Sequence, residues 1–276
     1  MYTSFTGSQN LNFLQTAFKS LESELKRIGY PEGIWVCYGS FILNTQTAGS
    51  DIDLLYIHSS SVPPQRVQSV YEGHPVTIYC VSREDFKNDG ESALYGGYFS
   101  GKVLNPYHVF SQSPDDSVLI KETGGSFIAP FAAMMAERVK RETSTATQLL
   151  VDSIYARFHI CPWYTSYFLR YFTLPYFPGL WDVMKTHMTS FLMSANAIRK
   201  VDDITYRYAQ VPSISQFHEK TIASVGRFWS IGSNFHENIP DFTGFYIQKA
   251  SSYVKTHGLE LQMNAMVEFL TEQSAI

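Results

Sequence analysis

The sequence predicts an α+β protein of two domains: a mixed β-sheet with flanking helices over residues 1–120, then an all-α helical bundle over residues 121–276. A chain of 276 residues is long enough for two packed domains. In the first third, short β-branched and aromatic runs alternate with amphipathic stretches. After about residue 125 nearly every segment carries helical periodicity with breaks at prolines, so we expect helices there.

The composition excludes several classes of protein. With 45% hydrophobic and 17% charged residues, the chain is globular and not disordered. The formal net charge of −4 argues against a general nucleic-acid-binding protein. Three scattered cysteines are too few for a disulfide framework or a zinc site. No apolar run approaches the roughly 20 residues of a membrane span, and no leader-like segment opens the chain, so we expect a cytoplasmic protein without a membrane partner.

Helices are expected at three places in the first third of the chain. Residues 10–29 repeat apolar side chains at helical spacing and close at Gly29. Residues 63–73, PPQRVQSVYEG, begin with prolines and stop at Gly73, which favours a second helix. The stretch SREDFKND, which starts at Ser82, is typical of a capped helix start.

Strands are expected at residues 34–38, 52–57 and 75–81, because these runs are short, apolar and rich in β-branched and aromatic residues. The second run begins with Asp51-Ile52-Asp53. Side chains alternate along a strand, so both carboxylates point to one face. They repel each other unless cations lie between them, and Mg²⁺ prefers such oxygen ligands together with phosphate oxygens.

The Gly39-Ser40 pair precedes these aspartates and ends the first strand. Glycine lets the backbone approach a triphosphate, and Ser40 can donate its N–H and hydroxyl to a phosphate oxygen. Two metal ions about 3.5–4 Å apart can clamp the attacking and leaving oxygens of a phosphoryl displacement. The pattern therefore indicates metal-dependent phosphoryl chemistry.

This arrangement resembles the polymerase-β-type nucleotidyltransferase superfamily, whose signature is Gly-Ser, a spacer, and Asp-x-Asp in a strand. The stretch GSFILNTQTAGSDIDLL keeps this pattern, including Ser50 before the first aspartate. Asn44 stands where a second glycine usually falls, and asparagine is the next best residue for a left-handed backbone conformation. Residues 73–86 and 96–104 are also similar in pattern to kanamycin-nucleotidyltransferase-like enzymes, which follow their catalytic domain with a helical bundle.

The resemblance implies an enzyme that uses two Mg²⁺ ions, held by Asp51 and Asp53, and an NTP, ATP first. Gly39, Ser40, Ser50 and Lys102 would bind the nucleotide. The product would be a nucleoside monophosphate, AMP for ATP, joined to a hydroxyl of a small molecule, with pyrophosphate released. An acidic chain is compatible with a polycationic acceptor such as an aminoglycoside antibiotic, and hence with antibiotic resistance. One chain or a homodimer can close such a site, and both alternatives stay open.

The chain departs from the family pattern at Thr77, where a third carboxylate is expected on the next strand. A threonine hydroxyl is a poor Mg²⁺ ligand and no general base near neutral pH. Asp152 is therefore our candidate for the base, with Glu137 second and His74 third. Each of these residues could instead lie on a solvated surface without a catalytic role. Lys102 could likewise be an exposed loop lysine that binds no nucleotide.

Two other readings stay open. The departure at Thr77 favours a catalytically silent relative that binds a nucleotide or a partner. A protein acceptor, as in toxin–antitoxin nucleotidyltransferases, would instead use the helical half as a docking surface. The aromatic stretch 158–181 either stacks on an adenine or lines an acceptor pocket, or it packs in a core or a subunit interface. No Walker A, G-x-G-x-x-G, H-E-x-x-H or G-x-S-x-G motif supports a rival chemistry.

Overall fold

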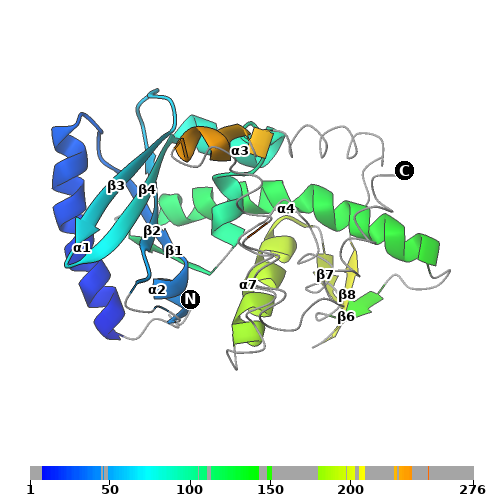
Figure 1. Cartoon of the computed structure of the whole chain (residues 1–276). Helices are drawn as coiled ribbons and strands as arrows, with labels where there is room; N and C mark the ends of the chain where they lie inside the picture. The colour runs from blue at the N-terminus through cyan, green and yellow to red at the C-terminus, as the bar shows by residue number, and fades with distance from the viewer. Residues whose placement is uncertain are drawn as a thin grey trace. The chain divides into compact units, whose positions relative to one another are not determined.

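The computed structural model describes residues 8–44, 46, 49–104, 106–110, 113–142, 148–150, 180–196, 198–202, 205–208, 227–228, 230–237 and 248. The chain divides into two compact units, Met1–Phe127 and Ile128–Ile276, and Figure 1 shows the elements of both. Among the helices described, none combines the length and the apolar character that crossing a bilayer requires. The mixed sheet with flanking helices that the sequence predicts is confirmed in the first unit.

The first unit is built on a five-stranded sheet of order β3-β4-β2-β1-β5. Its strands are β1 (Gly33–Tyr38), β2 (Ile52–His58), β3 (Gln65–Tyr71), β4 (His74–Ser82) and β5 (Tyr107–Phe110). Strands β2 and β4 are parallel, and every other neighbouring pair is antiparallel. The three predicted strands are confirmed as β1, β2 and β4, whereas β5 was not predicted because its four residues give too short a pattern.

Helix α1 (Ser8–Arg27) covers one face of this sheet. Its buried stripe runs from Leu14 through Phe18 to Leu25 and packs on alternate strand residues such as Trp35 and Leu54. Burying an apolar side chain of this size contributes about 1.5–3 kcal/mol, so this contact is a main source of stability. The predicted helix is confirmed.

The opposite face of the sheet is covered by helix α3 (Arg83–Ser92), the 3₁₀ helix η1 (Ser100–Leu104) and their connection, as Figure 1 shows for α1 and α3 on either side of the strands. Ser82 caps α3 by accepting a hydrogen bond from the Asp85 N–H at 2.9 Å, as the sequence predicts. Helix α4 (Pro114–Glu142) follows β5, and its residues as far as Phe127 belong to the first unit.

The predicted helix at residues 63–73 is wrong, because these residues form β3 and a hairpin with β4. Glu72 and Gly73 join the strands with positive φ angles of 47° and 82°, as a two-residue type I′ turn requires. Val67, Val70 and Tyr71 have helix-like spacing, which misled the prediction. Val67 and Tyr71 pack on the core, whereas Val70 points away and is 68% exposed.

The described part of the second unit contains helix α7 (Leu180–Ser194) and a small antiparallel sheet of order β6-β8-β7. Its strands are β6 (Gln148–Leu150), β7 (Ile198–Lys200) and β8 (Thr205–Tyr208). The prediction of helices alone is wrong for these residues, because strands of three or four residues are too short to show a period in sequence. The bundle as a whole stays a prediction.

The hairpin turn gives a test of the register of β3. Asparagine tolerates the left-handed conformation better than glutamate, so Glu72→Asn should raise the free energy of unfolding by about 0.5–1 kcal/mol. Glu72→Ala removes the same charge without favouring a positive φ, so it should give no such gain. Chemical denaturation followed by tryptophan fluorescence measures both, and equal effects of the two variants would contradict the turn.

Candidate functional site

The sheet places Gly39 directly against the Asp53 carboxylate. Strands β1 and β2 are antiparallel with Tyr38 opposite Asp53, so the residue after β1 lies beside the start of β2. Gly39 has a φ of 89°, and a Cβ added there would lie 2.6 Å from Asp53 Oδ2. Only glycine satisfies both the backbone angle and the close approach. The Gly-Ser turn and the aspartates, which are separated in sequence, therefore form one site.

The remaining motif residues lie around this contact. Ser40 begins the short helix α2 (Ser40–Leu43), and Asn44 ends it in the left-handed conformation with φ 55° and ψ 38°. The prediction for Asn44 is thereby confirmed, and its N–H donates to the Ser40 carbonyl. Asp51 is exposed one residue before β2, Asp53 is partly buried within it, and Ser50 is partly buried before both.

Thr77 lies next to Asp53 on the parallel strand β4, where a third carboxylate would have to stand. The two residues pair in register and so share a face of the sheet, and Thr77 is 5% exposed. The departure from the family pattern is thus located at the site itself. It leaves this face with Asp51 and Asp53 as its carboxylates near β2.

Of the three candidate bases, the structure describes the side chain of His74, and it does not lie on this face. His74 lies three residues before Thr77 and therefore on the α1 side of the sheet, where its ring packs on Phe13 at 5.7 Å and Phe41 at 5.3 Å. The interpretation of His74 as a base is therefore wrong. Asp152 lies outside the described residues, as does the side chain of Glu137, so both stay predictions.

Lys102 is not an exposed loop residue. It belongs to η1, and its Nζ lies 3.9 Å from the centre of the Tyr79 ring, 4.4 Å from that of Tyr98 and 5.4 Å from that of Tyr38. We call these three rings the tyrosine cage. The Tyr98 hydroxyl donates to the Tyr79 hydroxyl at 3.4 Å, which ties two members together. Aromatic faces attract a cation, so the cage holds the ammonium in place.

The electrostatics of the cage follow from burial and from Asp53. Burial lowers the pKa of Lys102 to about 8, and the negative charge of Asp53 opposes this shift. Burial and then Asp53 hold the pKa of Tyr38 well above its usual value. Tyr38 is only 7% exposed, and its hydroxyl is buried without a hydrogen-bond partner among the described residues. A buried polar atom without a partner is costly, which is typical of a ligand site.

A second buried carboxylate, Asp89 in α3, holds the segment that carries Lys102. Asp89 Oδ1 accepts from the N–H groups of Tyr95 at 2.8 Å and Gly97 at 2.9 Å. Its Oδ2 accepts from Phe99 N–H at 3.0 Å and from the N–H and hydroxyl of Ser100 at 2.9 and 3.0 Å. Five donors compensate for the burial that raises the pKa of Asp89. Sequence reasoning missed Asp89, because a carboxylate in a polar helix gives no sign of its distant partners.

Arg66 was also missed, because residues 63–73 were expected to form a helix. As part of β3 it pairs in register with Tyr79 and so lies on the Asp53 face of the sheet. Its positive charge acts on Lys102 and lowers the pKa of that residue. No clear signal in the sequence could have found it, because Ser69 and Val70 break the alternation of polar and apolar residues that a strand over 66–71 would show.

Asp51 and Asp53 are the residues near β2 that could contribute to holding a divalent cation. Asp51 and Asp53 are the hard oxygen ligands that Mg²⁺ prefers, and the Tyr38 hydroxyl is a nearby polar group without a partner in the described chain. Within the described residues no group of three or more histidine, cysteine, aspartate or glutamate side chains could hold a metal ion. Any such ion would therefore depend on ligand oxygens and water for most of its shell.

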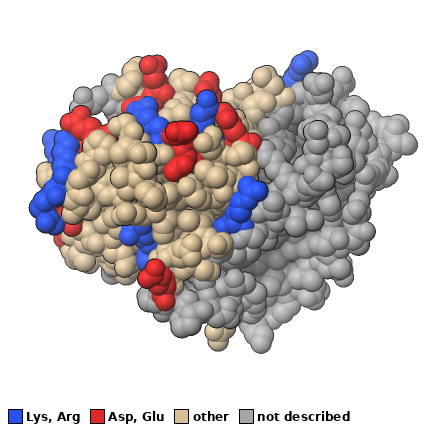
Figure 2. All heavy atoms as spheres, turned by 90° about the horizontal axis from the view of Figure 1, so that it is seen from above, with Lys and Arg blue, Asp and Glu red and all other residues tan. Residues whose placement is uncertain are grey.

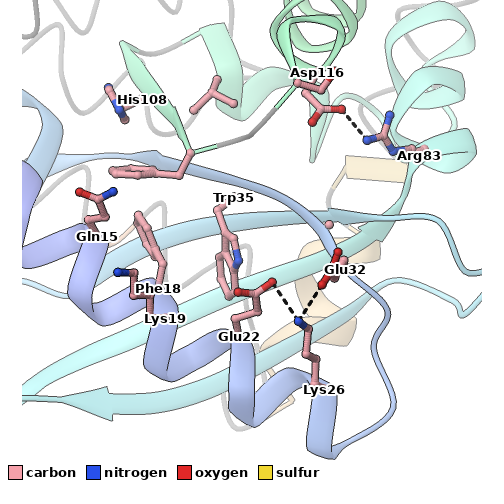
Figure 3. A pocket seen from close by; sticks show the side chains of 14 residues that line it. Gln15, Phe18, Lys19, Glu22, Lys26, Glu32, Trp35, Arg83, His108 and Asp116 are labelled. Carbon is pink, nitrogen blue, oxygen red and sulfur yellow. Dashed lines mark hydrogen bonds and ion pairs between the residues drawn. The ribbon is translucent and has the colours of Figure 1, made fainter.

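A cavity of about 650 Å³ lies elsewhere in the first unit and contains none of the predicted site residues. Figure 3 shows it between α1 and the edge of the sheet, with Trp35 and His108 in its wall. At one end Lys26 contacts Glu22 at 3.5 Å and Glu32 at 2.9 Å. Its charged groups thus pair largely with one another, which gives no preference for a ligand charge.

The surface agrees with the charge balance of the sequence. On the face that Figure 2 shows, acidic and basic side chains of the described residues lie among one another. A single basic stripe, the footprint of nucleic-acid binding, is not seen on that part of the described surface.

No protein-family profile matches the chain, and no curated protein does. Solved structures similar to it include a nucleotidyltransferase-like protein from Exiguobacterium sibiricum 255-15. The two chains are 12% identical, and the similarity covers 95% of this chain and 92% of that chain with a TM-score of 0.29. At this TM-score the two backbones overlap only weakly.

The contact between Gly39 and Asp53 gives a direct test. Gly39→Ala would place a methyl group against Asp53 Oδ2 and strain the backbone, so it should displace the carboxylate and weaken binding of Mg²⁺ with ATP by about tenfold or more. Gly49→Ala is the matched control, because a Cβ there meets nothing within 4 Å. Isothermal calorimetry compares them, and equal affinities would show that the contact does not shape the site.

The role of Asp89 can be measured separately. Asp89→Asn turns one acceptor oxygen into an amide that faces N–H donors, so it should lower the free energy of unfolding by about 2 kcal/mol. Glu122→Gln, an exposed position in α4, should change it by less than about 0.5 kcal/mol. Urea denaturation reads out both variants. An unchanged midpoint for Asp89→Asn would mean that the carboxylate does not hold the segment.

Proposed function

We propose that the chain is a Mg²⁺-dependent nucleotidyltransferase that moves a nucleoside monophosphate from an NTP, with ATP the first candidate, to a hydroxyl of a small molecule. The observation that carries the proposal is the packing of Gly39 on the Asp53 carboxylate. This contact joins the two halves of the Gly-Ser…Asp-x-Asp pattern in a single place. The proposal extends the sequence resemblance and does not depend on the weak similarity to solved structures.

In the reaction the acceptor oxygen forms a bond to the α-phosphorus while the bond from that phosphorus to the bridging oxygen breaks. Pyrophosphate leaves with the bonding electron pair, and the acceptor hydroxyl gives up its proton. Asp51 and Asp53 are the residues that would hold Mg²⁺, which offsets phosphate charge and orients the reacting oxygens. Gly39 leaves room for the phosphates, and Ser40 and Ser50 would donate hydrogen bonds to them.

Two positively charged side chains on the Asp53 face support the proposal that the substrate is an anion. Lys102 is held over the tyrosine cage, and Arg66 lies on the neighbouring strand beside Tyr79. Each would attract the triphosphate as a fixed charge. In phosphoryl transfer most of the rate comes from such positioning and charge neutralisation, so neither residue needs to take part in a bond-making step.

Asp152 remains our proposal for the group that accepts the hydroxyl proton, with Glu137 second. Thr77 cannot take this role, because its hydroxyl does not ionise near neutral pH. For the acceptor we propose a polycationic small molecule of the aminoglycoside kind, supported by the acidic net charge and by the resemblance. We also propose that the unit that contains Gly39 is the catalytic one. A homodimer that closes the site is part of the same proposal.

The second candidate is a catalytically silent protein of the same fold that binds a nucleotide or a partner. The buried Thr77 beside Asp53 favours it, because a third carboxylate on β4 is absent. Transfer of a nucleotide to a protein acceptor is a third outcome. A mass increase on a co-purifying protein would identify it.

The decisive experiment is calorimetric titration of each NTP with and without Mg²⁺. The wild type should bind one NTP in a metal-dependent way, and Asp51→Asn with Asp53→Asn should lower the affinity by about a hundredfold or more, because both charged ligands are lost. Asp115→Asn, an exposed aspartate in α4, is the matched control and should bind like the wild type.

Pyrophosphate release is followed in the same samples. Release on adding an aminoglycoside acceptor would support the enzyme, whereas binding without release would favour the silent relative. Nucleotide binding that neither aspartate affects, or no binding at all, would overturn the proposal.

A further inference from the structure

The Asp53 face of the sheet carries a cation that belongs to the protein. The Lys102 ammonium is held by rings from β1, from β4 and from the segment before η1. Tyr38, one of the three rings, pairs in register with Asp53 across β1 and β2, so the cage lies beside that carboxylate. The cage leaves the lysine little freedom, so its charge is fixed near the carboxylate where metal is expected.

The position of Lys102 is built into the fold and needs no ligand. Asp89 accepts hydrogen bonds from the N–H groups of Phe99 and Ser100, which lie three and two residues before the lysine. Gly97 has a φ of 81°, and a Cβ added there would lie 2.0 Å from the Phe127 ring, so the segment is tightly packed at this glycine. A lysine delivered by such a rigid segment acts as a preorganised charge.

The same face has one carboxylate fewer than a pair of metal ions would use. Thr77, in register with Asp53, is buried and uncharged. The carboxylates of Asp51 and Asp53 together balance the charge of one divalent ion. A second ion would find a hydroxyl in place of a carboxylate and a lysine ammonium in the neighbouring cage, and like charges repel each other.

We propose that the site takes one divalent cation, on Asp51 and Asp53, and that the Lys102 ammonium occupies the role of the second. This inference rests on the proposed nucleotide site and revises the expectation of two Mg²⁺ ions. The substrate is then an NTP that arrives with a single metal ion, and the Lys102 ammonium offsets part of the negative charge of the phosphate that lies against it. Thr77 and Lys102 belong together: where the third carboxylate is missing, the second metal ion is not needed.

The test counts metal ions directly and does not depend on turnover. Mn²⁺ serves as the probe, and electron paramagnetic resonance measures free Mn²⁺ while the wild-type chain is titrated in the presence of saturating α,β-methylene-ATP. We expect one bound Mn²⁺ per chain. Two bound Mn²⁺ ions per nucleotide-loaded chain would overturn the inference and leave the proposed function standing.

Variants separate the role of Lys102 from a merely structural one. Lys102→Met keeps the side-chain length but removes the charge, so affinity for the Mn²⁺ nucleotide should fall by about tenfold or more. The matched control is Lys87→Met in α3, whose lysine is exposed and pairs with Glu91 at 3.6 Å. An unchanged affinity in Lys102→Met would overturn the inference.

Thr77→Asp combined with Lys102→Met supplies the missing carboxylate and removes the competing cation. We expect this double variant to bind two Mn²⁺ ions, while Lys102→Met alone still binds one. A count of one in a folded double variant, verified by circular dichroism, would show that these residues do not set the number of ions. If no Mn²⁺ nucleotide binds to the wild type, the proposed function fails and this inference fails with it.

Discussion

The pairing of Tyr38 with Asp53 across β1 and β2 is the constraint on which the rest of the site depends. Antiparallel pairing brings the end of one strand beside the start of the next, so Gly39 meets the Asp53 carboxylate without any long-range folding of loops. The parallel pairing of β2 with β4 then places Thr77 at the same level. A slip of one residue in either register would turn Asp53 toward the apolar face under α1.

The two faces of this sheet differ in the side chains that they bury. The face under α1 is a continuous apolar core that includes Leu14, Trp35 and Leu54. The other face also buries apolar residues such as Leu55 and Val81. Beside them it holds carboxylates, tyrosines and cations, which are stable there because they contact one another or a buried hydrogen-bond network. Asp89 is the centre of that network, since five donors converge on it. Removing the carboxylate would leave buried N–H groups unsatisfied next to Lys102.

Much of the first unit could be predicted because its signals are local. The strands at 34–38, 52–57 and 75–81, the first helix and the Ser82 cap follow from periodicity and capping chemistry. The left-handed Asn44 follows from its place in the motif. The failures at 63–73 and in the small sheet of the second unit have one cause: short segments fit two periods, and the pairing partner decides between them.

The sequence by itself determined which residues open the site, because Gly39-Ser40 and Asp51-Ile52-Asp53 are a local pattern whose geometry follows from strand alternation. Only the tertiary structure decided the environment of those residues. In the structure Lys102 lies over the tyrosine cage and His74 lies on the apolar face. Arg66 lies on the Asp53 face, and Asp89 accepts hydrogen bonds from the segment before Lys102. Burial, charge and hydrogen bonding between distant segments depend on contacts, and contacts of that range have no period along the chain.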